Sequence, residues 1–201
     1  MAEGFCCDGR AAQSKADRFR LHSLRRDLYH RLGVDGYKTL GYELAESEAC
    51  IAADVIVVPT ARGDLLWGIY RGLQEQVDEE RIGSLPRLVA VDPFARLSRV
   101  LAGDDYRENF AGSSPLVSIN GPTVTYQSVA ALESSNGLAV AVDAGQAIAD
   151  QARLALEGLY LELSSTASLS ALGVLKSHDQ SIRRAVLVGT SSGYKEETRR
   201  I

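Results

Sequence analysis

Four short apolar runs, each followed by a turn, organise the hydrophobic positions along this chain. The run Asp54–Val58 is rich in β-branched residues, and Arg87–Asp92 and Gly137–Val142 are similarly apolar. Continuous apolar runs of this length indicate strands that are buried on both faces of a parallel sheet. Ala185–Val188 completes the set. We therefore predict an α/β fold in which a mostly parallel sheet is flanked by helices.

The segments between these runs carry helical or loop patterns. Asp64 and Asp143 stand at helix starts, where a carboxylate accepts backbone N–H groups. Gly103–Tyr126 is rich in Gly, Ser and Pro and predicts a long loop over the sheet. Tyr160–Leu163 predicts a short extended segment. The spacing of apolar residues predicts helices at Arg10–Leu32, Thr39–Ala49, Asp64–Gln76, Gln127–Ser135, Asp143–Leu156 and Ser165–Lys176.

Composition and charge narrow the class of protein without changing this picture. The 201 residues are 24% charged and carry a net charge of −4, which offers no general attraction to nucleic acid or to an anionic membrane. No apolar stretch is long enough to span a bilayer, and the N-terminus lacks the pattern of a secretory signal. Cys6, Cys7 and Cys50 suit neither a disulfide framework nor a zinc site. We expect a cytoplasmic protein that binds neither nucleic acid nor membrane.

Candidate chemistry gathers where two of the strands end. The loop Thr60–Leu65 joins the first strand to a helix, and backbone N–H groups at a helix start favour an anion such as phosphate. The hydroxyl cluster Thr190–Ser192 follows the last strand, at the edge where ligands of open α/β sheets bind. The sequence has no nucleophile elbow and no dinucleotide fingerprint after a strand. We predict no catalytic and no metal-binding residue.

Six motifs follow one another in a set order along the chain. They are GYKT with a following YE (36–39 and 42–43), PTARGDLLWGI (59–69), LPRLVAVDP (85–93), LAVAVD (138–143), EGLYLELSSTA (157–167) and TSSGYK (190–195). In this order they resemble the C-terminal part of fold-type II pyridoxal-phosphate enzymes of the threonine synthase and tryptophan synthase β type. The resemblance covers most of the chain after residue 35.

This resemblance implies a fold, a cofactor and a set of contacts. The fold is the tryptophan synthase β-like one, with residues 1–35 as the end of the small domain or a connecting helix and 36–201 as the part of the large domain that carries the cofactor-phosphate loop. The cofactor is pyridoxal 5'-phosphate, and Thr190 stands where a hydroxyl faces its pyridine nitrogen. The implied cofactor-binding residues are Thr60, Ala61, Arg62, Gly63, Asp64, Leu65 and Thr190.

The phosphate loop departs from the family pattern. The family's loop is rich in glycine because the backbone approaches the phosphate closely, whereas only Gly63 and Gly68 remain here. Arg62 offers a direct cationic contact. Asp64 repels a phosphate unless it turns away to cap the helix. The plainer interpretation of this loop is a tight turn with a capped helix and no ligand.

The second departure is the lysine that the family uses to form a Schiff base with its cofactor. No segment of the chain matches its motif, and we expect no such chemistry from the chain alone. The four lysines of the chain are Lys15, Lys38, Lys176 and Lys195.

Plainer interpretations also apply to three hydroxyl groups of the candidate site. Thr190 would bond its own backbone, and Ser164 and Ser165 would cap a helix.

Three functions remain open at this stage, and whether the chain is an enzyme is undecided. The first is a threonine synthase-like, pyridoxal-phosphate-dependent lyase that acts on an amino acid by β/γ-elimination or replacement, present as a C-terminal fragment or split subunit. Its partners would be a small amino-acid substrate and either further copies of the chain or a complementary N-terminal half. The second is an inactive remnant that serves as a binding or oligomerisation module. The third is an unrelated Rossmann-like nucleotide-binding domain.

Overall fold

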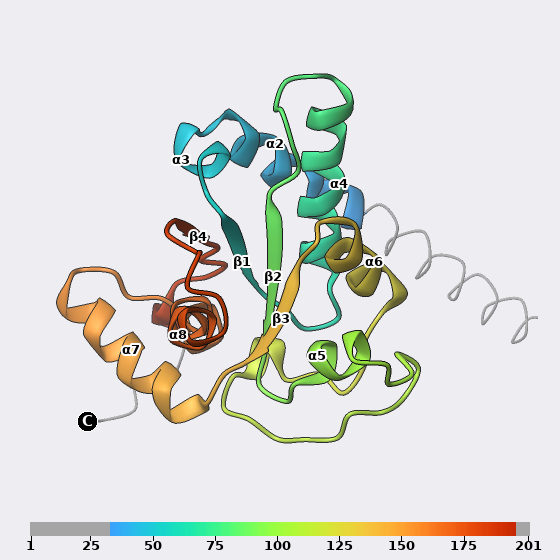
Figure 1. Cartoon of the computed structure of the whole chain (residues 1–201). Helices are drawn as coiled ribbons and strands as arrows, with labels where there is room; N and C mark the ends of the chain where they lie inside the picture. Colours follow the sequence, from blue (N-terminus) through green and yellow to red (C-terminus); the bar gives the residue numbers. More distant parts are fainter. Residues whose placement is uncertain (1–32, 196–201) are drawn as a thin grey trace, which may run out of the picture.

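A four-stranded parallel sheet forms the centre of the protein (Figure 1). The computed structural model describes residues 33–195, so the predicted helix Arg10–Leu32 lies outside the described residues. The strand order is β3-β2-β1-β4, and every neighbouring pair is parallel. The strands are β1 (Val55–Pro59), β2 (Arg87–Asp92), β3 (Leu138–Ala141) and β4 (Ala185–Leu187). The four predicted strands are confirmed, each end to within one residue.

Alternate residues of the central strands supply two separate apolar cores. Ile56 and Val58 of β1 pack with Leu66 and Ile69 of α4 (Asp64–Asp78), on the face that α2 (Lys38–Glu46) and α6 (Tyr126–Ser134) complete. Val55 and Val57 point the other way and pack with Ala167 and Ala171 of α8 (Leu163–His178), which lies beside α7 (Ala144–Leu156). Because successive side chains of a strand face opposite sides, a strand covered by helices on both faces is apolar throughout.

The first motif of the sequence holds α2 against α4. The Lys38 ammonium donates to the Glu75 carboxylate over 2.8 Å, and the Tyr42 hydroxyl donates to the same group. These bonds hold the pKa of Glu75 below its usual value and raise the pKa values of Lys38 and Tyr42. The lysine and tyrosine of GYKT…YE therefore join two helices, away from the ends of the strands.

The structure differs from the sequence prediction in two places. The predicted helix Thr39–Ala49 is interrupted at Ser47, after which α3 (Glu48–Ile51) begins. The helix α5 (Arg96–Leu101) was not predicted. It starts where the Asp92 carboxylate at the end of β2 accepts the N–H groups of Phe94, Arg96 and Leu97. The start of this helix is thus determined by a side chain at a strand end and not by a periodic apolar pattern.

The remaining segments surround the carboxyl ends of the strands, at the lower edge of the sheet in Figure 1. The predicted long loop is confirmed apart from the short 3-10 helix η1 (Val117–Ile119). Tyr160–Leu163, predicted as extended, contributes a single antiparallel bridge between Leu161 and Ser192. A second 3-10 helix, η2 (Gly193–Lys195), follows directly after Ser192. The segments that carry the sequence-predicted ligand contacts therefore meet at one edge of the sheet.

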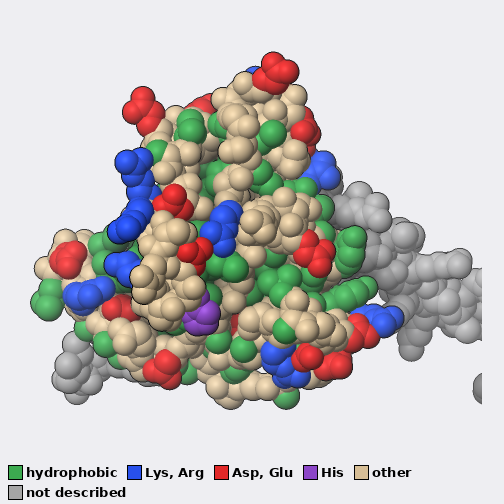
Figure 2. Space-filling model, viewed as in Figure 1, with side chains coloured by type: hydrophobic (Ala, Val, Ile, Leu, Met, Phe, Trp, Pro, Cys, Tyr) green, Lys and Arg blue, Asp and Glu red, His purple; other side chains and the backbone are tan. Residues whose placement is uncertain are grey.

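Side-chain types on the surface agree with the near-neutral charge balance of the sequence. Figure 2 shows acidic and basic side chains interspersed among other groups on one face. Within residues 33–195, no helix combines the length and apolarity that crossing a membrane requires. The same residues contain no group of three or more His, Cys, Asp and Glu side chains placed to hold a metal ion.

Candidate functional site

One open cavity of about 370 Å³ lies at the carboxyl ends of β1 and β4. Its volume falls within the range of about 300–1,000 Å³ that small-molecule sites occupy. All seven residues predicted as cofactor contacts line it: Thr60, Ala61, Arg62, Gly63, Asp64, Leu65 and Thr190. The rest of its lining is Tyr37, Pro59, Leu66, Ser118, Ile119, Glu162, Ser191 and Lys195. Two segments about 130 residues apart in sequence thus share one cavity, as the strand order requires.

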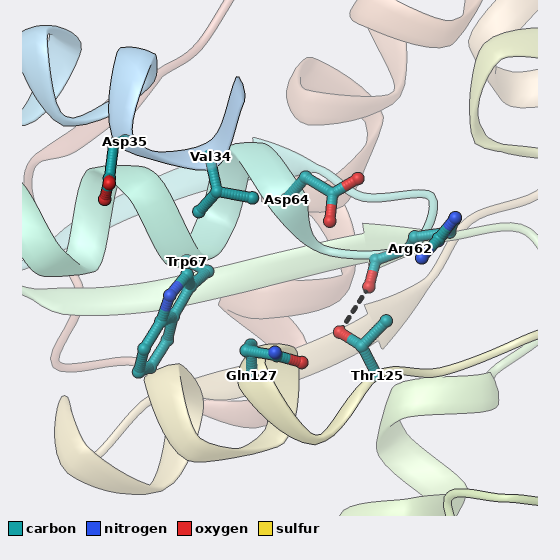
Figure 3. Close-up of a pocket in the computed structure, with 7 residues that line it drawn as sticks. All are labelled: Val34, Asp35, Arg62, Asp64, Trp67, Thr125 and Gln127. Carbon is teal, nitrogen blue, oxygen red and sulfur yellow. Dashed lines mark hydrogen bonds between the residues drawn. The ribbon is translucent and has the colours of Figure 1, made fainter. Parts of the chain in front are cut away.

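The loop Thr60–Leu65, here called the loop wall, is held by packing against α6. Gly63 has a φ of 101°, and a Cβ added there would lie 2.3 Å from the Ser128 Cβ. The Thr125 hydroxyl donates to the Arg62 carbonyl over 2.7 Å, as the dashed line in Figure 3 shows. Thr60 is fixed by its N–H, which donates to the Val91 carbonyl over 2.8 Å. The single glycine left in this loop is therefore required by its contact with a neighbouring helix.

The loop wall contains backbone donors that no other group of the described residues accepts, in residues that line the cavity. In the part of the chain that the structure describes, the N–H groups of Ala61, Arg62 and Gly63 donate to no acceptor. The helix that follows adds its positive dipole end. The prediction that Asp64 caps this helix is wrong, because Gly63 occupies the cap position and Asp64 is the first helical residue. Its carboxylate therefore remains at the cavity lining.

The opposite side, here called the α8 wall, is a network of side chains. The Ser165 hydroxyl lies 2.6 Å from the Thr190 hydroxyl and accepts the N–H groups of Thr190 and Ser191. The Ser164 hydroxyl accepts the Ser118 N–H over 3.0 Å. The interpretation of Ser164 and Ser165 as helix caps is therefore wrong, since both join α8 to other segments. Thr190 likewise bonds to Ser165 and not to its own backbone.

A buried carboxylate joins this wall to the C-terminal segment. Glu162 is only 3% exposed, and its carboxylate accepts hydrogen bonds from the Lys195 ammonium over 2.5 Å and from the Ser118 hydroxyl. Burial by itself raises the pKa of Glu162, but the Lys195 and Ser118 contacts outweigh it and leave the pKa below its usual value. The carboxylate is therefore ionised at neutral pH and fixes the Lys195 ammonium at the cavity.

A second cavity, of about 310 Å³, adjoins the first and is drawn in Figure 3. Arg62 and Asp64 line both cavities, and Trp67 and Gln127 close the far side of the second one. In Figure 3 the Arg62 guanidinium points away from the Trp67 ring, so the two side chains serve different parts of this surface. The start of α4 therefore faces two adjoining cavities.

A family model described as pyridoxal-phosphate dependent enzyme matches residues 9–191. The chain belongs to this family. A threonine synthase from Methanosarcina acetivorans is 27% identical over 146 residues, which are 69% of this chain and 36% of that protein. The family match decides against an unrelated Rossmann-like domain.

Solved structures of three other enzymes share the fold. An L-serine ammonia-lyase from Rhizomucor miehei superposes with a TM-score of 0.65 and 22% identity, over 80% of this chain and 51% of that one. A T.th. threonine deaminase superposes with a TM-score of 0.63 and 15% identity, over 82% of this chain and 59% of that one. Maize serine racemase superposes with a TM-score of 0.65 and 14% identity, over 80% of this chain and 50% of that one. The chain spans about half the length of these proteins, and the predicted tryptophan synthase β-like fold is confirmed.

The residues present fit the family's cofactor, pyridoxal phosphate. A phosphate group needs several donors, which the backbone N–H groups of the loop wall and Arg62 offer. The Thr190 hydroxyl, 2.6 Å from Ser165, retains a further hydrogen-bonding position for a ring nitrogen. The Asp64 carboxylate is the one lining group of the loop wall that opposes a phosphate.

Sequence reasoning missed the groups that build the α8 wall. Glu162 and Lys195 lie inside two of the recognised motifs, but nothing in their spacing indicates that they form an ion pair 33 positions apart. Ser118 lies in the irregular loop, where no periodicity marks it. The signal that could have drawn attention to Glu162 is its position between apolar residues just before a helix of small side chains.

Proposed function

We propose that this chain supplies the cofactor-binding half of a threonine synthase-like enzyme that acts on amino acids by elimination or replacement. Residues 36–201 correspond to the large-domain part, and residues 1–35 to the end of the small domain or a connecting helix. The observation that supports this most is the single cavity lined by all seven predicted contacts. Family membership and the threonine synthase relative support the reaction class. The composition of the sequence supports a cytoplasmic location.

Each wall has a separate part in binding the cofactor. The N–H groups of Ala61, Arg62 and Gly63, with the first turn of α4, would hold the phosphate. The Thr190 hydroxyl, oriented by Ser165, would meet the ring nitrogen. When bound, the cofactor supplies an electron sink for charge that develops on an amino-acid substrate. A hydroxyl at the ring nitrogen, in place of a carboxylate, leaves that nitrogen neutral and moderates the sink.

Chemistry requires a second polypeptide or a further segment that supplies a lysine. Lys38 is bonded to Glu75 of α4, and neither residue lines the cavity. Lys195 lines it but is held by Glu162. A complementary N-terminal half would supply this lysine, and we propose that the chain pairs with such a half or, without one, forms a homo-oligomer. The test is the melting temperature and mass of the chain over a wide concentration range. A monomer that melts cooperatively and independently of concentration would argue for a self-sufficient module.

A titration tests the cofactor half directly. Pyridoxal phosphate and inorganic phosphate are each added to the wild-type chain and to three variants, with affinity read from absorbance and calorimetry. Asp64→Gly should bind both ligands more tightly and Arg62→Ala more weakly, each by about three- to tenfold. Arg71→Ala is the matched control, because Arg71 lies on α4, as Asp64 does, but does not line the cavity. Its affinities should equal those of the wild type.

A second candidate function is an inactive binding or oligomerisation module. It is favoured by Gly63, since its positive φ and its contact with Ser128 account for the glycine without any ligand. If the folded Asp64→Gly and Arg62→Ala variants both bind phosphate and pyridoxal phosphate like the wild type, the loop wall is only a turn. That outcome would replace the enzyme proposal with the module.

A further inference from the structure

Arg96 is the largest side chain in the described part of the protein that is fully shielded from solvent. It begins α5 and does not touch the cavity of about 370 Å³. Burying a guanidinium is costly unless its donors are satisfied and its charge is paired. Its Nε lies 3.6 Å from the Asp92 carboxylate, which also anchors the start of α5. The Arg96 guanidinium lies near the end of β2, so the free-energy cost of burying it falls beside the candidate site.

The guanidinium connects two segments that line the cavity. One terminal nitrogen donates to the Thr60 carbonyl over 3.0 Å and to the Ile119 carbonyl over 3.2 Å. The other donates to the carbonyls of Gly121 and Thr123. Three acceptors thus come from alternate residues of one segment, 119–123, and the fourth is the first residue of the loop wall. The planar fork of arginine suits such a divided set of acceptors, and a lysine ammonium does not.

The two segments depend on Arg96 to different degrees. Thr60 is also fixed by its N–H to Val91 and by its hydroxyl to Val58. The segment 119–123 begins at the last residue of η1 and continues as a loop without regular structure. Its neighbours are anchored at Ser118, by α8, and at Thr125, by the Arg62 carbonyl. Between those anchors, Arg96 supplies three of the hydrogen bonds that determine where the backbone runs.

We propose that Arg96 is a positioning residue that sets the distance between the loop wall and the Ser118–Ile119 side of the cavity. This inference rests on the proposed cofactor-binding function. Inorganic phosphate would need only the loop wall, whereas the ring of pyridoxal phosphate would also need Thr190 and the Ser118 side, which line the same cavity. Loss of the guanidinium therefore weakens pyridoxal phosphate binding and leaves phosphate binding nearly intact.

The experiment compares Arg96→Lys with the wild type, well below the melting temperature of the variant. Pyridoxal phosphate should bind about tenfold more weakly, because a small displacement of one wall misplaces its contacts. Inorganic phosphate affinity should stay within about twofold, because the helix start is intact. Amide hydrogen exchange should accelerate in residues 117–123 and not in 61–66. Arg99→Met is the matched control, since Arg99 lies on the same helix with its side chain 54% exposed and pairs with Asp104.

A second variant keeps the test decisive if Arg96→Lys does not fold. Asp92→Asn retains an acceptor for the start of α5 but removes the charge that faces the guanidinium, and should shift the same readouts in the same direction by a smaller factor. Equal loss of phosphate and pyridoxal phosphate affinity, or unchanged exchange in 117–123, would overturn the role of Arg96. A wild-type chain that binds no pyridoxal phosphate would overturn the proposed function itself, whatever the exchange data show.

Discussion

The two walls of the cavity are built by opposite means. The loop wall is a short local segment whose shape follows from backbone geometry: one glycine at positive φ, packed on Ser128, and N–H groups without an acceptor among the described residues. The α8 wall is assembled from side chains far apart in sequence, with Glu162, Ser165 and Lys195 bonded to one another or to nearby segments. The difference shows that one wall keeps donors available for a ligand while the other uses its polar groups to hold itself together.

The largest expected loss of stability comes from a substitution in the loop wall. Gly63→Ala should lower the free energy of unfolding by about 3 kcal/mol or more, because it adds a left-handed strain of about 1–2 kcal/mol to a steric clash with Ser128. Gly158→Ala is the matched control, since Gly158 has a φ of 87° and no atom within 4 Å of the added Cβ. Urea unfolding of both variants separates strain from clash. Equal losses would show that packing on α6 does not determine the loop.

A smaller loss is expected from the α8 wall. Glu162→Ala should lower the free energy of unfolding by about 2 kcal/mol, because it removes the acceptor of Ser118 and leaves part of this wall unpaired. Glu157→Ala, at an exposed position five residues earlier, should change stability by less than about 0.5 kcal/mol. Urea unfolding measures both. A Glu162→Ala variant as stable as the Glu157→Ala one would mean that the α8 wall is not held by this network.

The charge of Glu162 adds a pH dependence of still smaller size. Its folded-state pKa lies below the usual 4.5, so ionised Glu162 stabilises the fold above pH 4.5, and this stabilisation is lost as the pH falls through the folded pKa. At neutral pH, Glu162→Gln should be less stable than the wild type by up to about 1 kcal/mol, because the partner Lys195 is half exposed. The difference should disappear in acid. A difference that grows below pH 4.5 would contradict the assignment.

The last prediction is that the α8 wall carries no covalent chemistry of its own. Lys195 lies at the cavity, but its side-chain nitrogen is held in an ion pair by the Glu162 carboxylate over 2.5 Å and is not placed to attack a ligand. Incubation with pyridoxal phosphate, borohydride reduction and peptide mapping should therefore yield no stoichiometric label on any lysine. Lys38, bonded to Glu75 away from the cavity, serves as the internal reference. A single full label on Lys195 would show that this wall reacts with the cofactor.

Much of the fold could be predicted because its signals are local. The four strands are apolar on both faces, and Asp143 caps α7 by accepting the Gln146 N–H, as the sequence predicts. The helix α5 was missed because its start depends on Asp92, and helix α2 was predicted too long because the interruption at Ser47 has no Gly or Pro to mark it. Of the candidate site, the seven contacts of the motifs came from resemblance, and their meeting in one cavity agrees with it.

The sequence by itself determined the strands, their parallel arrangement and the family, because apolar runs and ordered motifs are written along the chain. Only the tertiary structure decided which polar groups meet. Glu162 and Lys195 pair across 33 positions, and Arg96 gathers carbonyls from residues 60 and 119–123. No local pattern encodes such contacts, because they depend on where separate strand ends are brought together. The glycine at position 63 is required both by the positive φ of its own loop and by Ser128, 65 residues away, and only the second of these depends on the tertiary structure.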